Sequence, residues 1–501
     1  MKETGVTELE LKFEIPADRR RLVEDALRRG KVDRVHLRAR YFDTEESRLA
    51  RHGIVLRLRH EGGAWVQTAK GPGMGPLLRQ EHNFELGSTV KNAVSTVDLA
   101  RHSGTPVGKQ IGKALKLKIG AAPPLLLKPA YETDIWRLKR TTHHAGTVVE
   151  IALDRGRIFT AQHSQAVCEL ELELKRGAPE HLVQLARKWC AGHGLWLNSF
   201  SKSTGGQSLA EGGRASVATS ATPPEIKRHA NGQQIARAVI HACLTQVLAN
   251  ASAVAGGNSN PEHIHQLRVG LRRLRTAIRE LQTIATGIDL SWEAPLKAVF
   301  SALGQHRDQS HLSNVLAPAI EASGGPSVAS LAAGLTVIDP CRVTRSPAFQ
   351  DVLLCLIGFA YGSAMDDEAV TYDKVQKLTS RRLQSLRTTL AKEGKKFSAL
   401  DEARQHRLRK RLKKLRYFAE FVSPMFPPRR TKAFLSRLKP VQDALGDHHD
   451  MLVGLRAYRT FAVTDAEAWF GVGWLSARRS GSASMCQREM HAFAQLTPFW
   501  N

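Results

Sequence analysis

Glutamates that recur at every second position are the first residues in this chain whose spacing suits chemistry. Residues 8–14 alternate charged with apolar side chains, and residues 168–175 do the same. Alternate residues share one face of a β-strand, so both segments predict strands with an acidic face and an apolar face. The acidic faces carry Glu8, Glu10, Glu169, Glu171 and Glu173. Like charges on one face repel each other, so these strands require a counter-charge or a metal ion nearby.

Basic side chains follow the same period in neighbouring segments. Residues 54–59 carry Arg57 and Arg59 on one face, and residues 65–70 end at Lys70. Further candidate strands pair Arg79 with Glu81, Arg137 with Lys139, and Glu150 with Asp154. Taken singly, each is typical of the solvent face of an antiparallel strand. Taken together, separate acidic and basic strands favour a closed barrel with its charges inside and its leucines outside, under a layer of helices.

The order of these motifs resembles the CYTH, or triphosphate tunnel metalloenzyme, family. The series covers nearly all of residues 6–205 and runs E-x-E-x-K from Glu8, Tyr41-Phe-Asp-Thr44, Leu-Arg57-Leu-Arg59, Lys70, Arg79-Gln-Glu81, Glu150 to Asp154, E-x-E-x-E from Glu169, and Ser201-Lys202. The resemblance implies an α+β fold, an antiparallel tunnel of about eight strands with flanking helices. It also implies metal-dependent hydrolysis of inorganic triphosphate, or of a related triphosphate or polyphosphate.

The same resemblance implies roles for individual residues. Mg²⁺ or Mn²⁺ would be held by Glu8, Glu10 and Glu171 with help from Glu169 or Glu173, because hard cations prefer carboxylate oxygens. The cations that would clamp phosphate oxygens are Lys12, Arg57, Arg59, Arg79, Arg137 and Lys202. Related enzymes use a lysine, sometimes with a tyrosine, to activate water, and these positions match Lys70 and Tyr41. A lysine base requires a lowered pKa, which we expect neighbouring arginines to provide; Tyr41 also fits a packing role.

One departure from the family pattern bears on substrate length. Bacterial relatives often follow the Ser-Lys pair with an arginine and a tyrosine, whereas this chain continues from Lys202 with Ser-Thr-Gly-Gly. A cation at the far end of the substrate is therefore missing from the pattern. The preferred chain length stays open for that reason.

Composition divides the chain in two. We expect a first domain over residues 1–207, a small, polar, proline-bearing linker over 208–226, and an all-helical domain over 227–501. The helical part contains an internal repeat: the pattern of residues 265–275 recurs at 406–416, and that of 303–308 recurs at 445–450. Two dissimilar motifs that recur at nearly one spacing predict two related helical halves.

Both copies of the first repeated motif predict a basic helix stripe. At 100° per residue, His265, Arg268, Arg272 and Arg275 fall within about 80°. An adjacent apolar stripe holds Leu267, Leu271, Leu274 and Ile278. One such helix alone is typical of a solvated face. Two halves with the same stripe favour a shared cationic surface that an anion fills.

These repeats resemble the CHAD family, whose members bind inorganic polyphosphate and which is found joined to CYTH domains in bacteria. Carried over, the binding residues would be His265, Arg268, Arg272, Arg273, Arg275, His406, Arg409, Lys413, Lys414 and Arg416. A histidine there would strengthen binding when protonated below about pH 6.5. A second set of polar residues suits either metal ligands or, as we prefer, a polar network between helices: His306, Asp308, His448, His449 and Asp450.

The charge balance sets the class of partner. Lys and Arg number 73 against 47 Asp and Glu, giving +26, so we expect polyanionic partners. Aromatics are only 6%, too few for a single-strand stacking platform, and we expect no specific nucleic acid. Scattered cysteines, the lack of an N-terminal apolar segment, and a longest apolar run of only Val352–Ala360 predict a cytoplasmic protein without a membrane partner, with polyphosphate granules as a candidate location. The alternative to an enzyme is a non-catalytic polyphosphate-binding scaffold.

Overall fold

The computed structural model describes residues 5–73, 77–87, 97–116, 127–213, 216–327, 338–362 and 370–500. The chain forms two compact units, neither of them continuous in sequence. The barrel unit comprises Met1–Thr219, Leu244–Asn258 and Thr344–Ser363, and the helical unit comprises Ser220–Cys243, Ser259–Val343 and Ala364–Asn501. The domain boundaries expected at residues 207 and 226 stay predictions.

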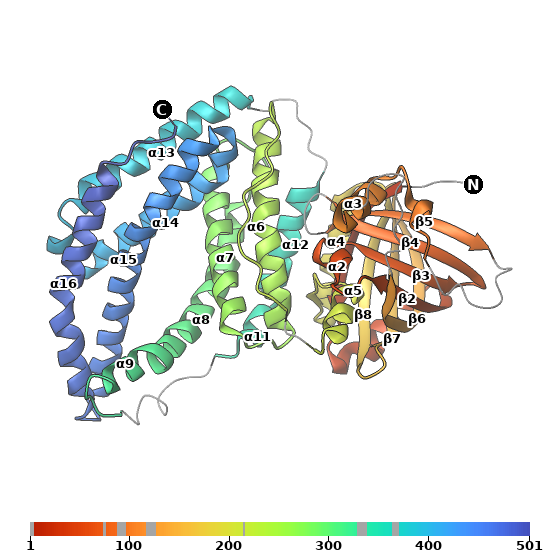
Figure 1. Ribbon diagram of the computed structural model, residues 1–501, viewed down its shortest axis with the longest axis horizontal. Coiled ribbons are helices and arrows are strands. Elements are labelled where there is room, and N and C mark those ends of the chain that lie inside the picture. The colour runs from red at the N-terminus through yellow and green to blue at the C-terminus, as the bar shows by residue number, and fades with distance from the viewer. Residues whose placement is uncertain are drawn as a thin grey trace. The chain divides into compact units, whose positions relative to one another are not determined.

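An antiparallel sheet that closes on itself forms the centre of the barrel unit (Figure 1). Its strands are β1 (Gly5–Glu14), β2 (Asp33–Asp43), β3 (Val55–Glu61), β4 (Ala64–Pro72), β5 (Leu78–Gly87), β6 (Lys128–His144), β7 (Thr147–Phe159), β8 (Ser164–Arg176) and the short β9 (Trp196–Leu197). The strand order is β5-β4-β3-β2-β6-β7-β8-β1-β9, and β5 also pairs with β1. That last pairing closes eight strands into a barrel, and it confirms the fold predicted from the sequence.

The period-two pattern sets which side chains face the lumen. On β1, Leu11 and Phe13 are fully buried, whereas the glutamates and the lysine between the apolar residues stay partly accessible. The β1–β8 register places Lys12 opposite Glu171 and Leu11 opposite Leu172, so both strands present charges to one side and leucines to the other. A shift of one residue would send every charge into the apolar layer, and the pattern therefore fixes the register.

Short helices surround the barrel. They are η1 (Ala17–Arg19), α1 (Arg20–Leu27), α2 (Arg48–Arg51), η2 (Leu99–His102), α3 (Pro106–Leu115), α4 (Pro179–His193) and α5 (Lys202–Ala210). α3 begins with a Thr105 cap and a proline, and it buries Val107 and Ile111 against Ile54 and Leu56. α5 approaches β6 closely, because a side chain on Gly206 would overlap the ring of Tyr131. Only glycine fits there, and this contact sets where α5 presents its first residues.

The remaining helices carry the repeat. They are α6 (Gly232–Ala255), α7 (Pro261–Leu281), η3 (Leu290–Trp292), α8 (Glu293–His311), the π-helical η4 (Leu312–Leu316), α9 (Ala317–Glu321), α11 (Pro340–Thr344), α12 (Pro347–Tyr361), α13 (Tyr372–Gly394), η5 (Phe397–Ala399), α14 (Glu402–Val422), η6 (Ser423–Met425), α15 (Pro428–Phe461) and α16 (Ala468–Ala494). The first motif lies on α7 and α14, and the second lies on α8 and α15. α7 packs against α8, α14 packs against α15, and α7 and α14 also meet. The predicted apolar stripe of α7 is confirmed, since Leu267, Leu271, Leu274 and Ile278 are fully buried.

One helix in the described part of the chain passes a length and composition test for crossing a membrane. It is α6, with a mean hydropathy of 1.5 over its most apolar window, and 78% of that window is buried inside the protein. Its apolar stretch is longer than the run from Val352 to Ala360 that the sequence draws attention to, because small residues such as alanine extend it.

Candidate functional site

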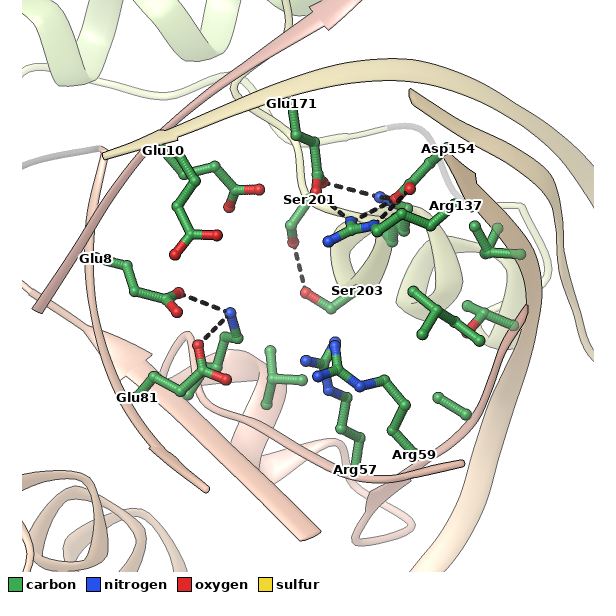
Figure 2. A pocket seen from close by; sticks show the side chains of 18 of the residues that line it. Glu8, Glu10, Arg57, Arg59, Glu81, Arg137, Asp154, Glu171, Ser201 and Ser203 are labelled. Carbon is green, nitrogen blue, oxygen red and sulfur yellow. Dashed lines mark hydrogen bonds and ion pairs between the residues drawn. The ribbon is translucent and has the colours of Figure 1, made fainter. Parts of the chain in front are cut away.

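The barrel encloses a cavity of about 280 Å³ whose wall is mostly charged (Figure 2). The predicted tunnel residues that line it are Glu8, Glu10, Lys12, Tyr41, Arg57, Arg59, Lys70, Arg79, Arg137, Glu171, Glu173 and Lys202. Of the predicted set, only Glu169 stands outside this lining, although it contacts Lys202. The close-up view shows carboxylates and guanidinium groups from several strands pointing into one space. The sheet therefore brings together residues that lie far apart in the sequence.

Three buried carboxylates and two cations form one cluster on β6, β7, β8 and α5. Lys202 Nζ lies 2.6 Å from Asp154 Oδ2 and 2.9 Å from Glu171 Oε1, and it also contacts Glu169. Arg137 donates two hydrogen bonds of 2.7 Å to Asp154 and contacts Glu171. Asp154, Glu169 and Glu171 each offer one carboxylate oxygen, all within 4.8 Å of one another. Such a set of hard oxygen donors suits a divalent cation such as Mg²⁺ or Mn²⁺.

A second group of charges surrounds Lys70. Its ammonium lies 2.9 Å from Glu8 Oε2 and 2.5 Å from Glu81 Oε2. Both of these ion-pair partners are carboxylates. β5 lies next to β4 and pairs with the start of β1, so Glu81 and Glu8 reach Lys70 from two strands.

Burial and crowding shift the pKa values of the carboxyl groups. Burial raises the pKa of Glu8 to about 7, against the opposing effect of Lys70. Burial, and then the neighbouring Glu171, raise the pKa of Glu10. The pKa of Glu171 is lowered, because Lys12, Lys202 and Arg137 together outweigh the effect of burial. Carboxylates packed this closely repel one another unless a cation is present. A divalent metal ion would relieve this repulsion.

Arginines form the opposite wall. The Nε atoms of Arg57 and Arg59 are buried and have no hydrogen-bond partner among the residues that the structure describes. Buried donors of this kind are costly unless a ligand satisfies them, and phosphate oxygens match the guanidinium geometry. Burial, followed by the charge of Arg57, lowers the pKa of Arg59 to about 10. Burial raises the pKa of Tyr41, but Arg57 opposes it, and the net pKa of this phenol is lowered.

The lumen also contains groups to which the sequence assigned no role. Asp154 and Glu81 were noted only as charges on candidate strands, yet they hold Lys202 and Lys70. Asp154 and Glu81 lie at an even spacing from Glu150 and Arg79 along their strands, and this spacing places them on the inner face. Their partners, however, come from other elements. Ser201 and Ser203, at the start of α5, also line the cavity. The close approach of Gly206 to Tyr131, which no local pattern reveals, sets their position.

The helical unit gathers part of the predicted basic set. Arg268 and Arg272 on α7 lie close enough to Arg409 and Lys413 on α14 for their charges to interact. Burial, and then Arg272 and Arg409, lower the pKa of Lys413 to about 6. The lowered pKa reflects the free-energy cost of placing cations close together without an anion. We call these four residues the cationic cluster.

Two residues of that predicted set, Arg273 and Lys414, instead contact carboxylates of other helices. Arg273 is 2% exposed, pairs with Glu420 and packs against the Phe421 ring. Lys414, its equivalent in the repeat, contacts Glu280. Each follows directly after a residue of the basic stripe, and a helix turns its successive side chains by 100°. Both therefore lie off the stripe, and their charges stabilise contacts between helices.

The histidines of the repeat behave differently from the expectation at pH 6.5. Burial, followed by the nearby Lys410 and Arg409, lowers the pKa of His406 to about 4, and burial also lowers that of His265. These rings are neutral near pH 7. His448 lies within hydrogen-bond distance of Gln405 and Ser482, each at 3.0 Å.

Asp450 and His449, from the second predicted polar set, also contact residues on other helices. Arg307 holds Asp450 through two hydrogen bonds of 2.9 and 2.7 Å. The His406 and His449 rings stack at 4.7 Å. These contacts favour the polar network over a metal site.

Comparisons with known proteins agree with this geometry. A CYTH domain model matches residues 7–206, and a CHAD domain model matches residues 238–459. An inorganic triphosphatase of Haemophilus influenzae is 25% identical over 172 residues, which is 34% of this chain and 44% of that protein. This match spans less than half the length of the curated relative.

Two solved structures are similar to parts of the chain. The CHAD domain of the plant Ricinus communis has 24% identity and a TM-score of 0.46, and covers 55% of this chain and 97% of its own. A putative adenylyl cyclase from Hippeastrum, described as having a dominant triphosphatase activity, has 16% identity and a TM-score of 0.28, and covers 40% of this chain and 91% of its own. With both family matches and the closed barrel in place, the chain is a CYTH domain over residues 7–206 followed by a CHAD domain over residues 238–459.

Proposed function

We propose that the tunnel hydrolyses inorganic triphosphate with a divalent metal ion, while the helical unit binds polyphosphate. The observation that carries the first part is the enclosed cavity with arginines on one wall and carboxylates on the other. CYTH enzymes hydrolyse triphosphates and depend on metal ions, and the acidic cluster fits such an ion. The cationic cluster and the CHAD family support the second part.

The cations of the wall bind and orient the substrate. The buried Nε–H groups of Arg57 and Arg59, which have no partner among the described residues, suit phosphate oxygens. The planar guanidinium groups would hold a phosphate chain in one orientation. Lys12 and Arg137 neutralise charge from the carboxylate side. Because these side chains are mostly buried, their interactions are screened less than in water and are stronger.

Carboxylates of the lumen would hold the metal ion. The oxygens of Asp154, Glu169 and Glu171 meet the distance requirement, and Glu8 and Glu10 lie on the adjacent strand β1. A bound Mg²⁺ or Mn²⁺ supplies neutralisation of the charge on the transferring phosphoryl group.

Two residues remain candidates for activating the attacking water. Tyr41 lines the cavity, and Arg57 favours its phenolate, which can accept a proton at Oη. Lys70 stands between Glu8 and Glu81, an arrangement that fixes its ammonium and suits orienting the substrate. We assign the proton-accepting role to Tyr41 and the orienting role to Lys70.

Phosphate release from inorganic triphosphate with Mg²⁺ or Mn²⁺ tests the proposal. The purified full chain is expected to release phosphate only when the metal ion is present, and Glu10→Ala is expected to abolish release. Glu14→Gln is the matched control, because Glu14 lies on the same strand outside the cavity lining and accepts a hydrogen bond from Asn198 that glutamine retains. If no divalent metal supports release, the polyphosphate-binding scaffold becomes the better description.

A further inference from the structure

The arginine row of α7 converges on a single aromatic ring. The guanidinium carbons of Arg268, Arg272 and Arg275 lie 5.1, 4.9 and 5.9 Å from the centroid of Phe300 on helix α8, which packs against α7. A ring face carries partial negative charge and attracts a cation within about 6 Å of its centroid. Three like charges that would repel one another thus share one neutral partner.

The ring leaves the hydrogen-bond donors of this row largely free. Within the described part of the chain, Arg268 and Arg272 form no ion pair with a carboxylate, and Arg268 donates one hydrogen bond of 2.8 Å to the Leu303 carbonyl. Arg275 has Glu293 as an acidic neighbour at 3.6 Å, and the charge of Asp308 acts on Arg268 without forming an ion pair. A cation–π contact uses the charge of the guanidinium and leaves its N–H groups available as donors. The row is therefore held in place while it stays able to bind an anion.

In the second half of the repeat, the equivalent arginine is held by a different kind of contact. The segment Val299–Asp308 aligns with Val441–Asp450, and this alignment places Gln442 at the position of Phe300. Gln442 accepts a hydrogen bond from Arg416, the repeat equivalent of Arg275, and Arg416 also pairs with Glu420 at 2.8 Å. The donors of Arg416 are thus used inside the protein.

From this asymmetry we propose that Phe300 is a positioning residue that preorganises the α7 arginine row for polyphosphate. The first half of the repeat then binds polyphosphate more tightly than the second half. The inference rests on the proposed polyphosphate binding. Its physical basis is that arginines already fixed by a ring lose less side-chain entropy when phosphate binds. The α8 helix contributes through a residue that itself need not touch the ligand.

Exchange of the two equivalent residues tests the inference in the full chain. Binding of polyphosphate is measured over a range of salt concentrations for Phe300→Gln, Phe300→Tyr and Gln442→Phe. Phe300→Gln is expected to weaken binding by roughly fivefold to tenfold, which corresponds to losing a cation–π interaction or two. It is also expected to flatten the salt dependence, because fewer phosphates are neutralised at once. Phe300→Tyr keeps the ring and is expected to bind like the unchanged chain, and Gln442→Phe is expected to bind at least as tightly.

Salt dependence separates positioning from a merely structural role, because a loss of packing lowers the melting temperature without changing how many phosphates are contacted. Should Phe300→Gln fail to fold, Phe300→Leu against Phe300→Tyr decides, since leucine fills space without a π face. The inference is overturned if Phe300→Gln or Phe300→Leu binds within twofold of Phe300→Tyr at the same salt slope. Failure of the unchanged chain to bind polyphosphate would instead refute the proposed function, and the inference with it.

Discussion

Lys202 and Asp154 form an ion pair of 2.6 Å between the first residue of α5 and the lumen face of β7. The Asp154 side chain has no solvent exposure, and Arg137 holds it from the other side. One buried carboxylate therefore places two cations that are proposed to bind phosphate. Its removal is therefore expected to affect both folding and substrate binding.

Asp154→Asn is expected to destabilise the protein by about 3 kcal/mol, because it removes the fully buried carboxylate that two cations share. Chemical denaturation measures this free energy of unfolding. The matched control is Asp134→Asn, since Asp134 lies on the adjacent strand and contacts His36 at 2.6 Å with its side chain 34% exposed. An exposed pair contributes under about 1 kcal/mol, so equal losses for the two variants would contradict the role given to Asp154.

Tyr41→Phe is expected to lower kcat for triphosphate by about a hundredfold with little change in KM, because it removes the proton acceptor and keeps the ring. Tyr131→Phe provides the control. Its ring stacks on Tyr41 at 4.5 Å and is similarly buried, but it does not line the cavity. Steady-state kinetics of both variants decide the question. Full activity in Tyr41→Phe together with loss in Lys70→Met would transfer the proton-accepting role to the lysine.

Polyphosphate affinity is expected to fall as pH rises from about 6 to 8. The free protein holds the pKa of Lys413 at about 6, so this amine is mostly neutral near pH 7. A bound polyanion favours the ammonium, and binding therefore takes up a proton and is strongest where Lys413 is already charged. Calorimetry in buffers of different ionisation enthalpy measures the uptake. Lys413→Arg keeps its charge throughout this range and is expected to lose the dependence; an unchanged pH profile in that variant would assign it to another group.

Neighbouring arginines on α7 are expected to respond in opposite ways to substitution. Arg272→Ala should weaken polyphosphate binding and lower the salt slope by about one, since one phosphate contact is lost, while the melting temperature stays close to that of the unchanged chain. Arg273→Ala should leave the salt slope intact and destabilise the fold by about 3 kcal/mol, because Glu420 loses its buried partner. Comparable loss of binding in both variants would place Arg273 in the binding surface after all.

Periodicity explains why much of the barrel is readable from the sequence. Leu11 and Phe13 alternate with charges, and a strand has only two faces, so the choice between lumen and apolar layer follows directly. The partners of Lys70 are different, because Glu8 and Glu81 reach it only once β1, β4 and β5 are packed in one register. Local pattern carries no information about such distant strand pairing.

The helical unit shows the same division between local and distant information. The angular positions of Arg272 and Leu271 follow from 100° per residue, and their environments agree with it. Family resemblance alone selected Arg273, although the same angle sets it off the stripe. The contact with the Phe300 ring could not be predicted from the helix pattern, because Phe300 belongs to another helix. Only the packing of α7 on α8 brings the arginines to it.

Strand β1 is both the first strand of the barrel and its seam, since residues 5–9 pair with β5 and residues 9–14 pair with β8. The barrel cannot close during synthesis until β8, which ends at Arg176, has left the ribosome. Until then β1 and β7, the two strands that pair with β8, each present an unpaired edge, and such edges are prone to association with other chains. Pairing between strands so far apart in the sequence also slows closure of the barrel.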